Sequence, residues 1–137
     1  MRFNPDLKKG QELTNRELMN IFKCATEGGM RRSHKTNSLI LISNHTKSGY
    51  NDKWSGEKFL FTGEGKVGDQ DINYSQNKTL ANSNENGISL FLFEIFEDRR
   101  YIYQGKVKLV DSPYQEIQTD INKKERKVWI FPLKSVD

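Results

Sequence analysis

Residues 50–70, YNDKWSGEKFLFTGEGKVGDQ, combine aromatic, acidic and glycine residues in a pattern suited to holding a planar polar ring. Aromatic faces stack on such a ring, a carboxylate accepts a hydrogen bond from an exocyclic amino group, and backbone amides at glycines can reach carbonyl or phosphate oxygens. A nucleobase is a ring of this kind. The segment therefore indicates contacts to a base, although each feature alone is a weak signal.

The charge balance permits a nucleic-acid partner without requiring one. The sequence carries 22 Lys and Arg against 18 Asp and Glu, a formal net charge of +4. The basic residues cluster at 31–35, 99–100 and 123–127, beside Gly, Asn or Asp residues that are typical of loops. Loops of one charge can share a face, but a solvated turn is the simpler explanation of any single cluster.

Residue types that usually catalyse reactions or bind metals are few and poorly spaced. Neither His34 nor His45 has a Cys, His or acidic residue at metal-ligand spacing. The segment GEGKVGDQ lacks the Lys-Ser or Lys-Thr ending of a P-loop, and its GxG has no βαβ frame. Cys24 has no partner for a disulfide or a metal. We therefore expect no catalytic residue, no metal and no cofactor.

Two helices are predicted. Thr14 and Glu17 have the spacing of a capping box and precede an apolar stripe, so they predict a helix that ends at the Gly28–Gly29 pair. A shorter helix is predicted over residues 75–83, with Ser75 as its N-cap.

The remaining apolar segments predict strands and an α+β, β-dominated fold. These strands cover residues 38–43, 58–62, 88–96, 100–110 and 126–133. The short charged segment between the third and fourth predicts a hairpin, and Gly105 predicts a bulge that curls the sheet toward a barrel. Pro132 predicts the end of the last strand or an edge position, and residues 111–125 predict a long surface connection.

The length of 137 residues predicts a single domain over 1–137. No stretch approaches the roughly 18 apolar residues that cross a bilayer, and the start lacks the apolar block of a signal peptide. We therefore expect a cytoplasmic protein without a membrane partner.

The order of the segments resembles that of the SRA (SET and RING associated) domain, the modified-cytosine reader of eukaryotic methylation factors and of bacterial McrA-type restriction endonucleases. The matching motifs are GGMR at 28–31, SLILIS at 38–43, YND at 50–52, FTGEG at 61–65, GDQ at 68–70, NKTLANS at 77–83, YIYQG at 101–105 and WIFPL at 129–133. No single motif is specific. Together they are collinear over nearly the whole chain, which argues against a chance match.

The resemblance implies a twisted, crescent-like β-barrel of the SRA/PUA-like type that clasps duplex DNA and flips one modified cytosine into a pocket. It places Tyr50 and Phe61 at the positions of two stacking aromatics. Asp52 matches the carboxylate that accepts from the cytosine N4 amino group, and Thr62 and Gly63 match the pocket floor.

The resemblance also implies loops that enter the DNA grooves and hold phosphates. The candidate DNA-binding residues are Arg31, Arg32, His34 and Lys35 in 28–36, and Lys66, Gln70, Asn73, Gln76 and Lys78 in 66–78. Trp54 either forms part of the pocket wall or caps the barrel.

The predicted function is recognition of 5-methylcytosine or 5-hydroxymethylcytosine in duplex DNA, as the targeting domain of a modification-dependent restriction endonuclease. An HNH nuclease usually accompanies such a domain in bacterial relatives, so the chain is compatible with the N-terminal part of a longer enzyme. Two alternatives stay open. One is a reader of another DNA mark, such as a phosphorothioate, through Arg31 and Arg32. The other is a PUA-like RNA or small-molecule enzyme that uses Asp52 or Asp69 as an acid or base.

Overall fold

The computed structural model describes residues 3–47 and 50–136, which form a β-rich chain with two helices. In chain order the elements are β1 (Glu12–Leu13), α1 (Asn15–Phe22), β2 (Met30–Ser33), β3 (Ser38–Asn44), β4 (Lys53–Ser55), β5 (Lys58–Thr62), α2 (Gln76–Ala81), β6 (Ser89–Ile95), β7 (Tyr101–Leu109), β8 (Tyr114–Thr119) and β9 (Glu125–Ser135). The predicted α+β, β-dominated class is confirmed. Among the described residues, no helix has the length and apolar character needed to cross a membrane.

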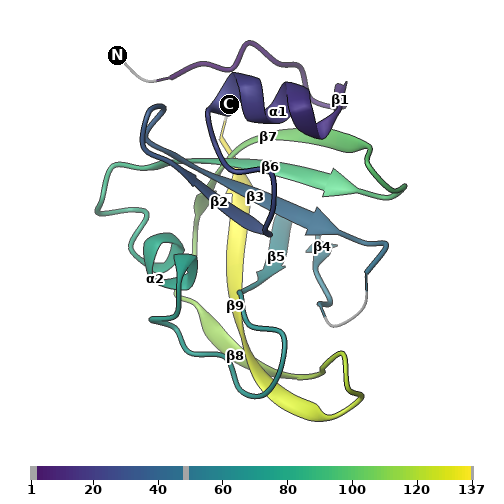
Figure 1. Cartoon of the computed structure of the whole chain (residues 1–137). Helices are drawn as coiled ribbons and strands as arrows, with labels where there is room; N and C mark the ends of the chain where they lie inside the picture. Colours follow the sequence, from purple (N-terminus) through teal and green to yellow (C-terminus); the bar gives the residue numbers. More distant parts are fainter. Residues whose placement is uncertain (1–2, 48–49, 137) are drawn as a thin grey trace.

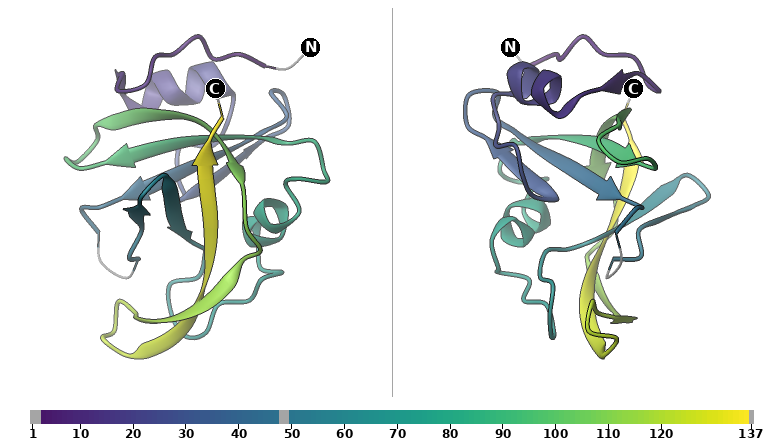
Figure 2. Two further views of the ribbon diagram at one scale, coloured as in Figure 1. Left: turned by 180° about the vertical axis from the view of Figure 1, so that it is seen from behind. Right: turned by 45° about the vertical axis from the view of Figure 1, so that its right-hand side comes forward.

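The strands of the described residues belong to one strongly bent sheet (Figures 1 and 2). Its main path runs β2-β3-β6-β7-β9-β5-β4, while β1 pairs with β7 and β8 pairs with β9. The β3–β6 pair is parallel, and the pairs on either side of it are antiparallel. In the part of the chain that the structure describes, no pairing joins β2 to β4. The predicted barrel is therefore a curled sheet that does not close.

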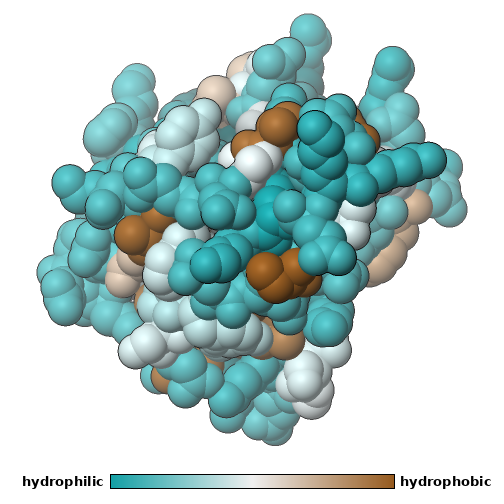
Figure 3. Space-filling model, turned by 90° about the horizontal axis from the view of Figure 1, so that it is seen from below, coloured by the Kyte–Doolittle hydropathy of each residue, from teal (hydrophilic) through white to brown (hydrophobic). Residues whose placement is uncertain are grey.

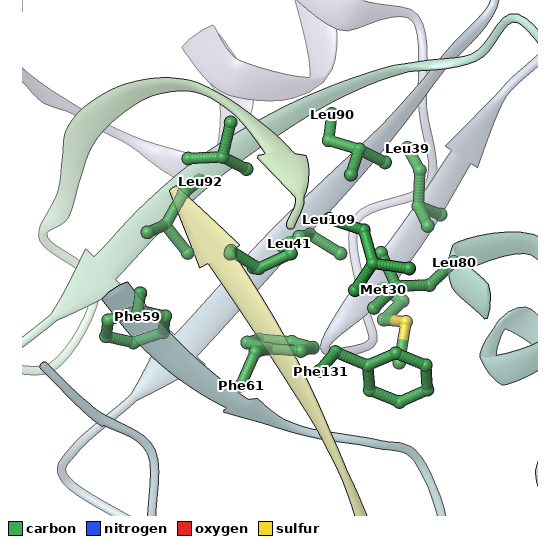
Figure 4. Close-up of a cluster of buried hydrophobic side chains, with 12 residues drawn as sticks. Met30, Leu39, Leu41, Phe59, Phe61, Leu80, Leu90, Leu92, Leu109 and Phe131 are labelled. Atoms are coloured by element: carbon green, nitrogen blue, oxygen red, sulfur yellow. The ribbon is translucent and has the colours of Figure 1, made fainter. Parts of the chain in front are cut away.

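Two clusters of buried apolar side chains hold the fold together. In one, Phe22 of α1 packs on Phe91 and Phe93 of β6, with ring centroids 5.2 and 5.7 Å apart. The other fills the inside of the curled sheet, where Phe59 and Phe61 of β5 face other buried residues (Figure 4). Each such side chain contributes about 1.5–3 kcal/mol relative to an exposed one.

Helix α1 begins as predicted and ends earlier. The Thr14 hydroxyl accepts from Glu17 N at 3.1 Å, and Oε1 of Glu17 accepts from Thr14 N at 2.9 Å, which completes the capping box. The prediction that the helix continues to Gly28–Gly29 is wrong. Lys23 has a φ of 56° and its N–H donates to Met19 O at 2.8 Å, so the helix already ends at Phe22.

Helix α2 covers the middle of the predicted 75–83 segment. Ser75 makes no side-chain cap, contrary to the prediction. Instead Oε2 of Glu64 accepts a hydrogen bond from Gln76 N at 3.1 Å. A carboxylate at this position satisfies one of the free N–H groups of the first turn. The helix is therefore attached to the loop that follows β5.

The predicted β6–β7 hairpin and its bulge are confirmed. Leu92 pairs with Gly105 and Phe93 with Tyr103, so the register shifts by one residue between these pairs. Gly105 has a φ of +105°, a conformation that side-chain-bearing residues rarely adopt. The bulge bends β7 so that its second half pairs with β9.

Two predictions about the C-terminal segment are wrong. Residues 111–125 contain strand β8, which pairs along β9 from Tyr114↔Ile130 to Thr119↔Glu125 and extends from the sheet as a long hairpin (Figure 1). Strand β9 also continues past Pro132 and lies between β7 and β5. The Pro132 carbonyl accepts a hydrogen bond from Val110 N at 3.0 Å. Because Val110 lies just beyond the end of β7, the N–H that proline lacks is not needed for the β7–β9 ladder.

Replacing Gly105 by Ala should lower the free energy of unfolding by about 1–3 kcal/mol, because the bulge requires positive φ. Gly29→Ala is the matched control. Gly29 has no positive φ, and an added Cβ would meet its nearest atom at an ordinary 3.6 Å. Urea denaturation of both variants measures the difference. Equal stability of the two variants would show that the bulge imposes no strain.

Candidate base-binding site

The loop that follows β5 is folded around the side chain of Asn77. Oδ1 of this residue accepts from Glu64 N at 2.7 Å, and its Nδ2 donates to Glu64 O and Asp71 O, both at 3.0 Å. Asn77 is fully buried. One amide side chain thus replaces the backbone pairing that this loop lacks.

Gln70 attaches the same loop to β9. Its Nε2 donates to Gly63 O at 2.7 Å and to Gly65 O at 3.1 Å, while its Oε1 accepts from Trp129 N at 2.9 Å. A Cβ on Gly63 would lie 2.7 Å from Asn77 Oδ1 and 3.1 Å from Gln70 Oε1. The glycine is therefore required by these two amides. The FTGEG, GDQ and NKTLANS segments form one hydrogen-bonded unit.

Arg126 of β9 connects this loop to the aromatic residue of the YND segment. Its NH1 group donates to the carbonyl oxygens of Gly65 and Gly68. The guanidinium carbon lies 5.8 Å from the centre of the Tyr50 ring. The loop, the β8–β9 hairpin and Tyr50 therefore lie together.

Asp52 follows Tyr50 by two residues, and each oxygen of its carboxylate accepts a hydrogen bond from the protein. Oδ1 accepts from Thr62 N and Oδ2 accepts from the Ser43 hydroxyl, each at 2.6 Å. Burial raises the pKa of Asp52 above its ordinary value, and the hydrogen bonds from Ser43 and Thr62 oppose that rise. The two oxygens have about four lone-pair sites, and the Ser43 hydroxyl with the N–H and the hydroxyl of Thr62 uses three of them, so the carboxylate can accept a further hydrogen bond.

A cleft of about 540 Å³ opens beside Tyr50, between the chain before β4 and strand β8. Its lining residues are Tyr50, Asn51, Lys53, Glu116, Ile117, Gln118 and Thr119. The Tyr50 side chain is 36% exposed, so a planar ligand can reach it. At the end of the molecule seen from below, the surface is mainly hydrophilic with separate apolar patches (Figure 3).

Strand β8 adds two polar side chains that the sequence did not predict. Gln118 donates from Nε2 to Glu116 Oε2 at 2.8 Å and lies 3.4 Å from Thr62 Oγ1. These residues fall in the segment predicted to be a surface loop, so no sequence signal places them beside Thr62. Arg126 was also missed, because its basic cluster is typical of a solvated turn.

The two other aromatic candidates do not line the cleft. Phe61 is 2% exposed and belongs to the core, 6.4 Å from the Phe59 ring (Figure 4). Trp54 packs edge-on against Phe59 at 4.9 Å and donates from Nε1 to Glu94 Oε1 at 3.0 Å. Of the two alternatives for Trp54, the structure favours a cap over the core.

The histidine of the β3 end belongs to the same network as Trp54. His45 stacks on Phe96 with ring centroids 4.8 Å apart, and its Nε2 lies 2.7 Å from Glu94 Oε2. Within the described ranges, no group of three or more His, Cys, Asp or Glu side chains could hold a metal ion.

Arg31 does not present its guanidinium to solvent, contrary to its expected role at DNA. The residue is 4% exposed, and it donates to Asn15 Oδ1 at 2.6 Å, to Gly28 O at 3.0 Å and to the Tyr101 hydroxyl at 3.3 Å. These bonds attach α1 and the GGMR segment to β7. Arg31 therefore supports the fold.

The other residues of the 28–36 segment lie away from the cleft. Arg32 is partly buried and donates to Ser33 O and Ser38 O. His34 and Lys35 are exposed in the turn between β2 and β3, which lies on the other side of the molecule from β4 (Figures 1 and 2). This segment and Tyr50 thus occupy different regions of the surface.

The 66–78 segment divides into a structural and an exposed part. Gln70 is 6% exposed and Gln76 is partly buried, whereas Lys66, Asn73 and Lys78 are exposed. Lys66 lies in the loop that Arg126 and Gln70 hold against β9. Of the predicted cationic residues, Lys66 is therefore the one that the described contacts associate with the Tyr50 region.

A comparison with family models identifies the family of this chain. A family model for the ScoMcrA-like SRA domain matches residues 9–137. The chain belongs to this family. The expected SRA membership is thereby confirmed, while a search of curated proteins found no significant match.

Solved structures share the SRA fold at low sequence identity. The sulfur binding domain and SRA domain of ScoMcrA, complexed with phosphorothioated DNA, has a TM-score of 0.76 at 16% identity, with 95% of this chain and 40% of that chain covered. The Type IV phosphorothioation-dependent restriction endonuclease ScoMcrA has a TM-score of 0.72 at 15% identity, with 96% and 29% covered. The SUVH5 SRA complex with methylated CHH DNA has a TM-score of 0.71 at 19% identity, with 99% and 94% covered. The chain thus spans less than half of either ScoMcrA chain.

Replacing Asp52 by Asn should change how the stability of this SRA domain depends on pH. Burial raises the pKa of Asp52, so the folded protein binds this proton more tightly than the unfolded chain. The stability from this group is complete below the unfolded pKa of about 3.9 and is lost as pH rises through the folded pKa. The free energy of unfolding of the wild type, relative to Asp52→Asn, should therefore fall as the pH rises from about 4.

Urea denaturation of both proteins at a series of pH values measures this relative stability. The difference between the two proteins cancels the contributions of other titrating groups. A difference that stays constant between about pH 4 and pH 7 would contradict the raised pKa.

Proposed function

We propose that this SRA domain recognises modified cytosine, 5-methylcytosine or 5-hydroxymethylcytosine, in duplex DNA by flipping the base into the cleft beside Tyr50. The observation that carries the proposal is the Asp52 carboxylate, fixed by Ser43 and Thr62 next to an exposed aromatic ring. The SUVH5 SRA complex with methylated DNA supports it by its shared fold.

Base flipping costs a few kcal/mol of unstacking, which contacts in the pocket must offset. Stacking of a base on an aromatic side chain is worth about 1–3 kcal/mol. Tyr50 offers this contact, and Arg126 next to it adds a cation close to the ring. Stacking on the Tyr50 ring and hydrogen bonding to the Asp52 carboxylate therefore supply a free energy similar to the cost of flipping.

The carboxylate of Asp52 fits the amino edge of cytosine. An N4 amino group donates two hydrogen bonds, whereas a carboxylate only accepts. Because Ser43 and Thr62 already orient both oxygens, little further ordering is required on binding. We assign Asp52 to the recognition of N4, with Thr62 and Gly63 as the floor of the pocket.

Exposed lysines of the loop after β5 and of the β8–β9 hairpin supply the phosphate contacts of the proposal. Lys66 in the loop and Lys123, Lys124 and Lys127 of the β8–β9 hairpin are exposed. The hydrogen bonds of Arg126 join these two segments, so their charges approach a duplex together. Exposed Asn73 and Lys78 remain predicted contacts.

We further propose that the domain is the targeting part of a longer modification-dependent restriction endonuclease that acts in the cytoplasm, with a fused or associated HNH nuclease. The similarity to part of the restriction endonuclease ScoMcrA supports this assignment. Residues 1–137 would then act as one DNA-binding unit without a catalytic centre.

The structure argues against direct reading of a phosphorothioate through the two arginines. The guanidinium groups of Arg31 and Arg32 are both engaged by internal acceptors. Asp69, the second acid considered for an enzyme, accepts from Lys127 N at 2.8 Å and holds the loop to β9. Arg31, Arg32 and Asp69 are therefore already engaged within the fold.

Asp52→Asn should abolish the preference for 5-methylcytosine over thymine, which has a carbonyl oxygen in place of the N4 amino group, while leaving most of the overall affinity. Asparagine places a donor where the N4 amino group requires an acceptor, but phosphate contacts do not depend on the base. Fluorescence anisotropy on one duplex with a thymine, 5-methylcytosine or 5-hydroxymethylcytosine target measures both quantities. Tyr50→Ala should weaken binding of both modified duplexes by about 5- to 150-fold, equivalent to 1–3 kcal/mol of stacking. An Asp52→Asn protein that keeps its preference would refute the assignment of Asp52.

Salt dependence should identify the basic segment that contacts the duplex. Replacing both Lys66 and Lys124 by Gln should reduce the slope of log affinity against log salt by about 0.9 for each phosphate that the protein no longer neutralises. Lys35→Gln is the matched control in the β2–β3 turn, and we expect its slope to equal that of the wild type. The reverse result would place the duplex at the 28–36 segment.

A further inference from the structure

We propose that the side-chain carbonyl of Gln118 is a second acceptor for the amino group of the flipped base. This inference rests on the proposed function and deepens it. It assigns to strand β8 a part in distinguishing 5-methylcytosine from thymine. Thymine has the same 5-methyl group but carries a carbonyl oxygen where cytosine carries the N4 amino group. Neither the motifs nor the family resemblance includes this residue.

The orientation of the Gln118 amide follows from its neighbours. Its Nε2 donates to the Glu116 carboxylate at 2.8 Å and faces the Thr62 hydroxyl at 3.4 Å. The flipped amide would place its carbonyl oxygen against the Glu116 carboxylate, where two acceptors repel each other. Oε1 therefore points away from Glu116.

That oxygen is buried and has no hydrogen-bond partner among the described residues. Gln118 is only 8% exposed, and it lines the cleft beside Tyr50. Buried acceptors are nearly always satisfied in folded proteins, so an unsatisfied one at a cleft indicates a ligand donor. A ligand that donates here gains a hydrogen bond without displacing an existing one.

The polar groups around the cleft select for such a donor. Glu116 and Gln118 line the cleft with a carboxylate and a carbonyl oxygen. Thr62, which Gln118 Nε2 faces at 3.4 Å, holds the Asp52 carboxylate with its N–H, so all three groups present acceptors near Thr62. The N4 amino group of cytosine has two N–H bonds and can donate to both Asp52 and Gln118. Thymine presents a carbonyl oxygen at the same position, which would face these acceptors without a proton between them.

A comparison of two duplexes tests the proposal. One carries 5-methylcytosine opposite guanine, and the other carries thymine opposite guanine at the same position. The mismatched thymine is easier to flip, so a pocket that ignored the amino group would bind the second duplex at least as tightly. The wild type should prefer 5-methylcytosine, and Gln118→Met should reduce this preference about tenfold, the effect of one hydrogen bond of about 1.4 kcal/mol.

A control variant separates reading of the base from support of the strand. Gln115→Met changes an exposed glutamine on the other face of β8 and should keep the wild-type preference. Thermal unfolding confirms that each variant is folded, and Gln118→Leu replaces Gln118→Met if the methionine variant is not.

The outcomes distinguish this inference from the proposed function. A folded Gln118→Met protein that retains the full preference for 5-methylcytosine over thymine overturns the role of Gln118. A wild type that binds cytosine and 5-methylcytosine duplexes equally overturns the proposed function itself. Loss of preference in Gln118→Met with normal preference in Gln115→Met supports the proposal.

Discussion

The site depends on two buried amides that replace backbone pairing in the loop after β5. Asn77 satisfies the backbone of Glu64 and Asp71, and Gln70 connects the glycines of the loop to β9. A loop without such partners would leave polar groups buried and unpaired, at a cost of about 1–3 kcal/mol each. Because the two amides fix this loop, Thr62 at its start can hold the Asp52 carboxylate in one position.

This arrangement separates the residues that build the site from those that are free to contact a ligand. The glycines and amides of the motifs contact one another within the fold. The guanidinium of Arg31 is likewise bound internally, to Asn15. The residues that line the cleft are Tyr50, Asn51, Lys53 and four residues of β8. The residues of a family motif can therefore be those that hold a binding site in place, while other residues contact the ligand.

The sequence predicted the elements whose pattern is local. The capping box of α1, the β6–β7 hairpin and the bulge at Gly105 follow from neighbouring residues and are confirmed. Strand β8 was missed because its polar residues pair with β9 and show no apolar alternation. Phe61 was placed in the pocket by resemblance, yet its position on β5 directs it into the core. Which face a side chain occupies depends on tertiary packing that a single sequence does not encode locally.

The central claim is that a cytosine leaves the duplex and enters the cleft beside Tyr50. The most direct measurement places 2-aminopurine next to a 5-methylcytosine in a duplex and follows its fluorescence as the protein is added. Flipping removes a stacking neighbour, so we expect the fluorescence to rise to saturation with the same midpoint as binding. Saturated binding without a rise in fluorescence would show that the base stays stacked, and would contradict this claim.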